Sequence, residues 1–317
     1  MGKIIFNTII WGLLIAATSC NRPQSGEKSL NDYFAGSLPD TIPVLFFPER
    51  LHEEMNVRDI TFSIDYKEFY FTQITSDTFI MMSTYIPGGW TIPSVSPFSG
   101  SFSDFEPFMT PDGNYLYFSS KRPSKDKFSM EKDIDIWRVH RMDSGWSVPG
   151  LLDKPVNSKC MEYYPSVSGA GNLYFGRNDS ALTRGDIYVS QLINNNYSEP
   201  QKLPEPVNTP ETSFNAFISP DERYIIFSAY IQENDSWHSD LYISYRNRDG
   251  NWEGPKNLGK NINSGRNDFS PWVSYDGRFL FFTSTRLDTT GMNRKHNIFW
   301  VRTSAIEDFN QLILRSR

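Results

Sequence analysis

The sequence predicts an all-β protein that folds as a single β-propeller of four-stranded blades. Two observations predict this fold: a β-rich unit recurs five times, and each copy carries a tight turn that ends in phenylalanine. Steps of 47, 57, 52 and 55 residues separate these phenylalanines, which are Phe71, Phe118, Phe175, Phe227 and Phe282. A unit of four short strands cannot bury a hydrophobic face alone, so the copies are expected to pack radially.

The most complete copy shows how each strand is predicted. Phe105–Thr110 and Tyr115–Ser120 are rich in β-formers and flank the turn Pro111–Gly113. Proline presets φ at the second turn position, and glycine accepts the left-handed conformation that closes a hairpin. The third strand is Asp135–His140, and the fourth passes through Trp146–Pro149. Because proline cannot donate to a strand ladder, we expect Pro149 at a strand end or edge.

The other copies repeat these elements in the same order. The third strand returns as DIY, DLY and NIF, and the fourth returns as GWTIP, NYSEP and NWEGP. The fifth copy has no fourth-strand segment, whereas an apolar run, Pro43–Pro48, precedes the first copy. We therefore expect the N-terminus to supply the missing strand and to remove the exposed edge. The sequence predicts five blades, or six if residues 31–51 form more than one strand.

These repeats resemble the TolB-type, WD40-like (PD40) β-propeller family, and more closely the lipoproteins with such repeats in Bacteroidota envelopes. The residues that carry the resemblance are TPDG (110–113), SPDE (219–222), the DIW, DIY and DLY triplets, and the tails LDKPVNS (152–158) and LGKNINS (258–264). The resemblance covers about 43–309. It implies a propeller in the cell envelope, and it leaves the activity open because propellers serve unrelated functions.

The N-terminal residues predict a secreted lipoprotein. Lys3 precedes the apolar run Ile4–Ala17, and small residues lead to Cys20. The run is too short for a membrane span, so residues 1–19 are expected to be a signal peptide. The segment resembles a lipobox, which implies that Cys20 is acylated. The alternative is ordinary secretion with cleavage nearby.

Residues 20–42 are polar and are expected to form a lipid-anchored tether. Residues 43–317 are then the propeller, with repeats near 56–103, 104–160, 161–212, 213–267 and 268–309. Asn21 is not the aspartate that marks inner-membrane retention, so we expect the outer membrane. Only Glu27 is acidic near the anchor, which favours the periplasmic face over the cell surface.

Charge and composition limit the partners. The formal net charge is −6, and a protein that binds a phosphate backbone needs a basic stripe, so nucleic acid is not an expected partner. The expected partners are the membrane, through the lipid anchor, and an envelope protein or a carbohydrate. With Cys20 lipidated, Cys160 is the remaining thiol, and no histidine lies near it in sequence.

The sequence contains none of the common catalytic motifs. It has no G-x-S-x-G, H-E-x-x-H, P-loop or G-x-G-x-x-G pattern. We therefore predict no catalytic residue, no metal centre and no cofactor, apart from calcium at the site described next. The turn aspartates are interpreted as structural: Asp65, Asp112, Asp221 and Asp276. Within a blade, the arginines that end second strands (Arg122, Arg177 and Arg286) and the aspartates that open third strands (Asp135, Asp186 and Asp240) are expected to form ion pairs or hydrogen bonds.

One repeated position is a candidate ligand site. Asp104, Glu162 and Asp268 each stand three residues before the proline of a first strand, where Ser213 and Val57 stand in the other two copies. First strands line the channel of a propeller, so these carboxylates should share one rim. They would bind a polar ligand or a cation, for which oxygen ligands favour calcium. The alternative is that each caps the backbone of a neighbouring blade.

Three functions follow. The first is a non-catalytic binding or scaffold propeller anchored as an outer-membrane lipoprotein. The second is a carbohydrate-active enzyme, for which Asp104 and Glu162 would have to lie about 5–10 Å apart in a sugar-sized cleft. The third is a structural subunit of an envelope or secretion complex, which an exposed apolar patch would indicate.

Overall fold

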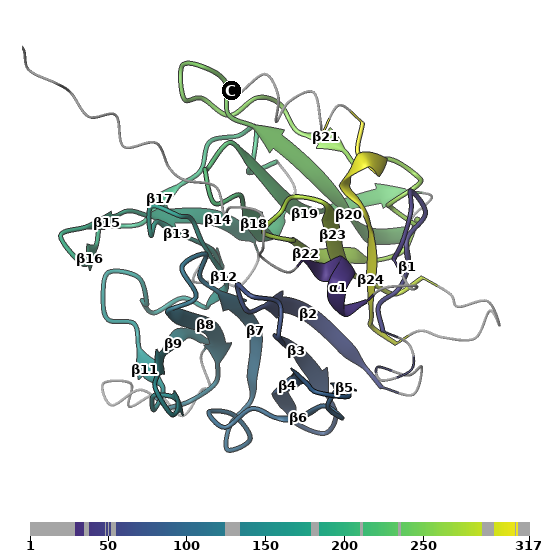
Figure 1. The fold of residues 1–317 in the computed structure, drawn as a ribbon. Helices are drawn as coiled ribbons and strands as arrows, with labels where there is room; N and C mark the ends of the chain where they lie inside the picture. Colours follow the sequence, from purple (N-terminus) through teal and green to yellow (C-terminus); the bar gives the residue numbers. More distant parts are fainter. Residues whose placement is uncertain are drawn as a thin grey trace, which may run out of the picture.

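Five antiparallel sheets of four or five strands surround a central axis in the computed structural model, and the hairpin β15–β16 forms a separate two-stranded sheet (Figure 1). The structure describes residues 29–34, 38–47, 49, 51, 55–123, 134–178, 184–209, 212–233, 236–286, 295–307 and 309. The predicted fold class is confirmed, with five blades rather than six. The predicted signal peptide and Cys20 lie outside the described residues. Among the described residues, no helix has the length and apolar character to cross a membrane.

The blades follow one another along the chain. Blade 1 contains β2 (Val57–Phe62), β3 (Glu68–Ile74), β4 (Thr78–Ile86), β5 (Gly89–Trp90) and β6 (Ser94–Val95). Blade 2 contains β7 (Asp104–Met109), β8 (Tyr115–Ser120), β9 (Asp135–Met142), β10 (Gly145–Trp146) and β11 (Gly150–Leu151). Blade 3 contains β12 (Glu162–Val167), β13 (Leu173–Asn178), β14 (Gly185–Ser190), β15 (Leu192–Ile193), β16 (Asn196–Tyr197) and β17 (Gln201–Lys202).

Blades 4 and 5 complete the ring. Blade 4 contains β18 (Ser213–Ile218), β19 (Tyr224–Glu233), β20 (Ser236–Tyr245) and β21 (Lys256–Asn257). Blade 5 contains β22 (Asp268–Val273), β23 (Phe279–Ser284) and β24 (Asn297–Arg302), followed by a short 3-10 turn at Thr303–Ala305. The inner strands β2, β7, β12, β18 and β22 lie nearest the centre (Figure 1).

The fourth strand of a blade is interrupted where the sequence predicts one continuous strand. In blade 2, β10 and β11 both pair with β9, and Ser147–Pro149 lies between them outside the ladder. Pro149 has no N–H to donate, so the outer edge breaks at this residue. Blade 1 repeats the arrangement, with β5 and β6 both on β4.

The N-terminal segment closes the ring, as predicted. β1 (Val44–Leu45) pairs antiparallel with β24 as the outermost strand of blade 5. Phe46, which follows β1, is 1% exposed and packs against Trp300 and Phe281 of blade 5 and Phe62 of blade 1. The closure therefore joins the last blade to the first through an aromatic cluster.

Part of the segment predicted as a tether packs on the propeller. Leu30–Tyr33 form a short helix, α1, and Leu30, Tyr33 and Phe34 are buried. The ring of Phe34 stacks on Trp90 of blade 1, with 5.2 Å between centroids. Sequence reasoning missed these three residues because residues 20–42 are polar on average. In the structure, the three side chains pack against the junction of blades 5 and 1.

Candidate functional site

The three predicted carboxylates occupy one position in three blades. Asp104, Glu162 and Asp268 are the first residues of β7, β12 and β22, and each is 0% exposed. Each forms an ion pair with the arginine that follows or ends the second strand of its own blade. The nitrogen–oxygen distances are 2.8 Å for Arg122–Asp104, 2.8 Å for Arg177–Glu162 and 2.9 Å for Arg286–Asp268.

These ion pairs correct the pairing expected from the sequence. The arginines pair with first-strand carboxylates and not with the aspartates that open third strands. Asp186 instead forms ion pairs with Arg184 and Lys202, and Asp240 accepts a hydrogen bond from Asn257. Register alone does not explain the difference, because Arg177 lies opposite Glu162 in the β12–β13 ladder and opposite Asp186 in the β13–β14 ladder.

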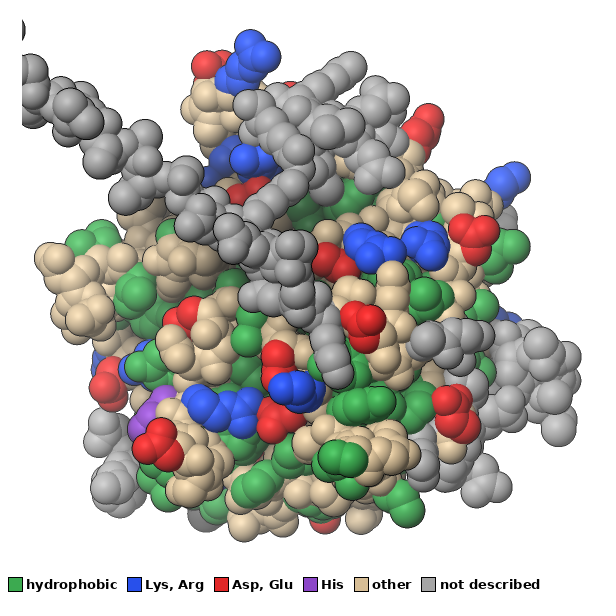
Figure 2. Space-filling model, in the orientation of Figure 1, with side chains coloured by type: hydrophobic (Ala, Val, Ile, Leu, Met, Phe, Trp, Pro, Cys, Tyr) green, Lys and Arg blue, Asp and Glu red, His purple; other side chains and the backbone are tan. Residues whose placement is uncertain are grey.

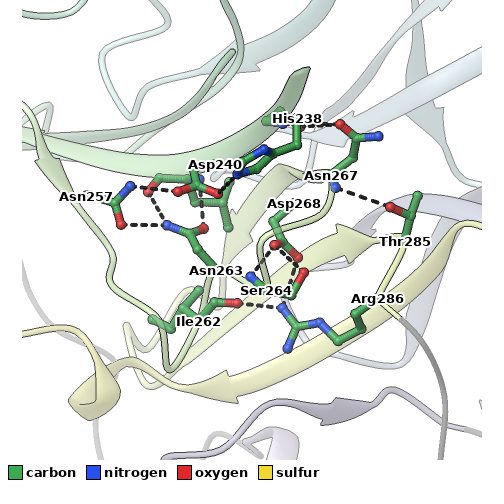
Figure 3. Close-up of polar contacts among 12 residues, drawn as sticks. His238, Asp240, Asn257, Ile262, Asn263, Ser264, Asn267, Asp268, Thr285 and Arg286 are labelled. Atoms are coloured by element: carbon green, nitrogen blue, oxygen red, sulfur yellow. Dashed lines mark hydrogen bonds and ion pairs between the residues drawn. The ribbon is translucent and has the colours of Figure 1, made fainter. Parts of the chain in front are cut away.

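The same carboxylates bind the segment that leads into their blade. Figure 3 shows Asp268 between Arg286 and Ser264, whose backbone N and Oγ donate to Asp268 Oδ2 at 2.6 and 2.7 Å. Ser158 donates to Glu162 in the same way, from its backbone N and its hydroxyl. Glu162 and Asp268 thus connect the last loop of one blade to the inner strand of the next.

The rim does not gather into a metal site. Within the described ranges, no three His, Cys, Asp or Glu side chains are close enough to hold one ion. Burial raises the pKa of Glu162 to about 7, although Ser158 and Arg177 lower it. The proposal that Asp104, Glu162 and Asp268 bind a ligand or calcium stays a prediction, while their contacts supply a structural role.

The repeated tail asparagines act as substitutes for strand residues. The side chain of Asn157 accepts from the backbone N of Ile136 and donates to the carbonyls of Ile136 and Leu152. Asn208 makes the same three contacts in blade 3. Asn263 also bonds both backbone groups of one third-strand residue, Leu241 (Figure 3). The tail asparagines therefore form hydrogen bonds with backbone groups at the open edge of the third strands in blades 2, 3 and 4.

A second ring of residues lies two positions further along the inner strands. In every blade a non-glycine residue has a positive φ, between 48° and 58°, and is buried. Such residues cost on the order of 1–3 kcal/mol each and persist only where surrounding structure enforces them. In at least four blades the strand register shifts at this position. The ring residues are Asp59, Glu106, Tyr164, Asn215 and Ser270.

Arg58 joins the two acidic members of the ring. Its Nε lies 2.8 Å from Asp59 Oδ2, and its Nη2 lies 2.8 Å from Glu106 Oε1. Glu106 also accepts from Ser119 Oγ at 2.7 Å and from the backbone N of Tyr164 at 2.8 Å. Burial raises the pKa of Glu106 to about 7, against the opposite effect of Arg58.

The remaining ring residues bind one another across blades. Tyr164 donates its hydroxyl to the carbonyl of Pro271 at 3.1 Å, and Asn215 donates to Ser270 Oγ at 2.8 Å. Further along the inner strands, Phe108 of blade 2 and Phe217 of blade 4 are 6.4 Å apart between ring centroids. Side chains thus fill the channel, polar in the ring and aromatic beyond it. We call the ring residues together with Arg58 the channel plug.

Sequence reasoning missed the channel plug. Five different residue types share the position, so no repeated letter marks it, and a positive φ at a residue other than glycine cannot be read from sequence. Only the alignment of the repeats could have located the ring, because each ring residue stands two places after an aligned residue. The aligned residues are Val57, Asp104, Glu162, Ser213 and Asp268.

The chain is similar in fold to solved propellers of different activities. No family model matches the sequence, and no curated protein matches it. The α-L-arabinofuranosidase PaAbf62A from Podospora anserina aligns with a TM-score of 0.50 and 12% identity, covering 84% of this chain and 98% of that one. The catalytic domain of the GH62 α-L-arabinofuranosidase from Coprinopsis cinerea has a TM-score of 0.49 and 11% identity, covering 80% and 93%.

A protein described as TolB from Agrobacterium tumefaciens aligns with a TM-score of 0.48 and 15% identity, covering 78% of this chain and 90% of that one. These neighbours include the TolB-type propeller that the repeats resemble. At such identities the similarity concerns the fold alone, so the function has to be argued from the residues of this chain.

Proposed function

We propose that the protein is a non-catalytic binding propeller that is held in the cell envelope by a lipid anchor. The observation that carries the proposal is the channel plug. Its ring residues are between 1% and 7% exposed, and Arg58 binds both ring carboxylates at 2.8 Å. A channel closed by its own ion pairs offers no open carboxylate pair to a substrate, which favours binding at the outer surfaces of the blades.

The lipid anchor and the location in the outer membrane are proposed from the resemblance of the sequence to envelope lipoproteins. Acylation at Cys20 would leave the propeller at the end of a short segment on the periplasmic face of the outer membrane. Intact-mass measurement of protein extracted from membranes should give a chain that begins at Cys20 and carries acyl groups. A free, unmodified N-terminus at this residue would contradict the anchor without affecting the proposed binding role.

The binding role is tested by copurification. Gentle extraction of the tagged full chain from native membranes should recover a protein or glycan in stoichiometric amount. The surface supports a mixed, polar partner: in the coloured part of Figure 2, acidic, basic and hydrophobic side chains lie interspersed. If the propeller is recovered alone and hydrolyses glycosides, the binding role is wrong and the protein is a carbohydrate-active enzyme.

That second candidate is a carbohydrate-active enzyme, and one observation favours it. Asp59 and Glu106 contact the same guanidinium, so they are a carboxylate pair that sequence reasoning did not supply. A carboxylic acid with a pKa of about 7 is protonated often enough at neutral pH to act as a general acid. Hydrolysis of aryl glycosides by the full chain, abolished by Glu106→Gln and by Asp59→Asn, would establish it.

A further inference from the structure

A hollow of about 380 Å³ lies between blades 2 and 3, at the face that carries the Thr110–Tyr115 turn. Three tyrosines and one arginine form part of its lining: Tyr115, Tyr117, Tyr197 and Arg138. Polar side chains from both blades and from the β15–β16 hairpin also contribute: Thr110, Asp112, Ser168 and Asn195. The volume is at the lower end of the range for small-molecule sites, about 300–1,000 Å³.

Arg138 is fixed by the tyrosines of this hollow. Its guanidinium carbon lies 5.0 Å from the centroid of the Tyr115 ring and 5.9 Å from that of Tyr117. Nη1 donates to Tyr117 Oη at 3.1 Å. Tyr117 and Tyr197 share a hydrogen bond of 3.0 Å between their hydroxyls, and Tyr197 donates to the carbonyl of Gly171. The guanidinium is thus held by stacking and by a chain of hydroxyls.

Arg138 has no carboxylate partner among the described residues. Its single hydrogen bond, to Tyr117, uses one of the five N–H donors of a guanidinium. Burial lowers the pKa of Arg138, and the groups that raise it above its ordinary value are tyrosines, with no carboxylate among them. Asp112 lines the same hollow, but its oxygens accept from Thr110 Oγ1 and from both nitrogens of Asn114 within its own turn.

The corresponding hollow between blades 1 and 2 contains its own counterion. It has a volume of about 350 Å³ and is lined by both Glu68 and Arg141. Arg141 Nη2 lies 2.5 Å from Glu68 Oε2, and the guanidinium stacks on Trp146 at 4.0 Å. Trp146 Nε1 donates to Tyr70 Oη, which in turn donates to Glu68. Here Arg141 and Glu68 pair across the blade junction, while Asp65 and Lys67, which also line the hollow, pair with each other within blade 1.

At the junction between blades 3 and 4 the stacked arginine also has a carboxylate partner, which here comes from its own blade. Arg246 forms an ion pair of 3.0 Å with Glu222 and stacks on Trp252 at 4.6 Å. The strand registers show which residues correspond at the three junctions. Each junction has one cross-strand pair at this position: Arg141 with Trp146, Arg246 with Trp252, and Leu192 with Tyr197. Between blades 2 and 3 the junction arginine is therefore replaced by Leu192, and Arg138 enters from the other blade without a carboxylate.

We propose that the hollow between blades 2 and 3 binds the carboxylate of an acidic sugar, with Arg138 as the group that recognises it. The proposal rests on the proposed binding function and assigns its ligand class. A planar carboxylate matches the guanidinium fork and takes the place that Glu68 and Glu222 occupy at the paired junctions. Arg138 is an exposed residue, and its one side-chain hydrogen bond among the described residues uses Nη1, so further N–H groups remain for a ligand.

The rest of the lining favours a sugar over an apolar or peptide ligand. Tyr115 and Tyr197 are half-buried, so part of each ring faces the hollow. Aromatic faces accept the C–H face of a pyranose, while Ser168, Asn195 and the tyrosine hydroxyls suit its hydroxyl groups. The apolar part of the lining comes from Pro111, Val167 and Leu192. Leu192 closes over Gly171, where a Cβ would meet its Cδ2 at 2.6 Å.

The test compares two probes that differ only at C6. Methyl galacturonoside carries the carboxylate, and methyl galactoside carries a hydroxymethyl group in its place. In ligand-detected NMR titrations with the full chain, we expect the acid to bind at least tenfold more tightly. Arg138→Met should weaken the acid at least tenfold and leave the neutral sugar unchanged. Arg138→Lys, which keeps the charge but loses the fork, should fall between them.

Arg141→Met is the matched control, because it removes a stacked arginine from the paired junction. It should leave the affinity for the acid within twofold. Equal binding of the two probes, or equal binding to the parent and Arg138→Met, would overturn the site. Tighter binding of galactose 6-sulfate than of the galacturonoside would overturn the assignment to a carboxylate. If the site fails while copurification still recovers a partner, the binding role survives; if both fail, the binding role falls too.

Discussion

Arg58 and Arg138 are both held by neighbouring side chains, but the partners differ. In the channel, Arg58 contacts two carboxylates at 2.8 Å, and the ring around it is buried. At the junction of blades 2 and 3, Arg138 contacts tyrosines, and no described carboxylate pairs with it. Removing one partner of a buried ion pair destabilises a structure strongly, whereas a fixed charge with unused donors can recognise a ligand. The difference separates a structural centre from a candidate binding surface.

The largest effect should come from breaking the channel plug. Arg58→Met leaves Asp59 and Glu106 buried without their cation, so we expect a loss of about 3–5 kcal/mol in the free energy of unfolding. Denaturant titration followed by tryptophan fluorescence measures it. Adding Asp59→Asn and Glu106→Gln to this variant should recover much of the loss, since no charge remains unpaired. An unchanged midpoint in the single variant would mean that the plug is not structural.

Ring closure should come next. Phe46→Ala removes a side chain that is 1% exposed between blades 5 and 1. Phenylalanine-to-alanine changes in cores cost about 3–5 kcal/mol, and we expect the lower end because a terminal segment can partly collapse into the cavity. Val44→Ala is the control in the same segment, since Val44 is 41% exposed. Equal thermal shifts for the two variants would contradict closure through Phe46.

The rim should give a smaller, pH-dependent effect. The pKa of Glu162 is raised from 4.5 to about 7 by burial, so the folded protein holds this proton more tightly than the unfolded chain does. Its contribution to stability is therefore full below about pH 4.5 and is lost as the pH rises through about 7. Glu162→Gln should remove a decline of about 3 kcal/mol across this range. The measurement is the difference in unfolding free energy between parent and variant at each pH, and a constant difference would exclude the shift.

The smallest stability losses should come from the two junction arginines, and Arg141→Met should lose more than Arg138→Met. Arg141→Met breaks an ion pair whose partners are 33% and 21% exposed, so we expect a loss of about 1 kcal/mol. Arg138→Met breaks no ion pair, so the change should stay within about 0.5 kcal/mol. Thermal melts of both variants under one buffer condition make the comparison. A larger loss for Arg138→Met would show that the unpaired arginine is structural after all.

Residue patterns predicted the strands better than the contacts. The turn Pro111–Gly113 and the DIW triplet at 135–137 located β8 and β9, because turn geometry and strand propensity are local properties. The break at Pro149 followed from a missing N–H, although the sequence predicted one strand. The burial of Leu30, Tyr33 and Phe34 was not predicted, because their partners lie far away in the chain.

The repeat, the turns and the closure by the N-terminal strand could be predicted from the sequence, since each depends on residue spacing along the chain. The folded structure sets which charges meet. It paired Arg122 with Asp104, turned Asp59 and Glu106 toward Arg58, and left Arg138 among tyrosines. The physical reason is that an ion pair depends on distances of a few ångströms between separate strands and blades. Strand register and blade packing set those distances, and neither can be read from the order of the residues.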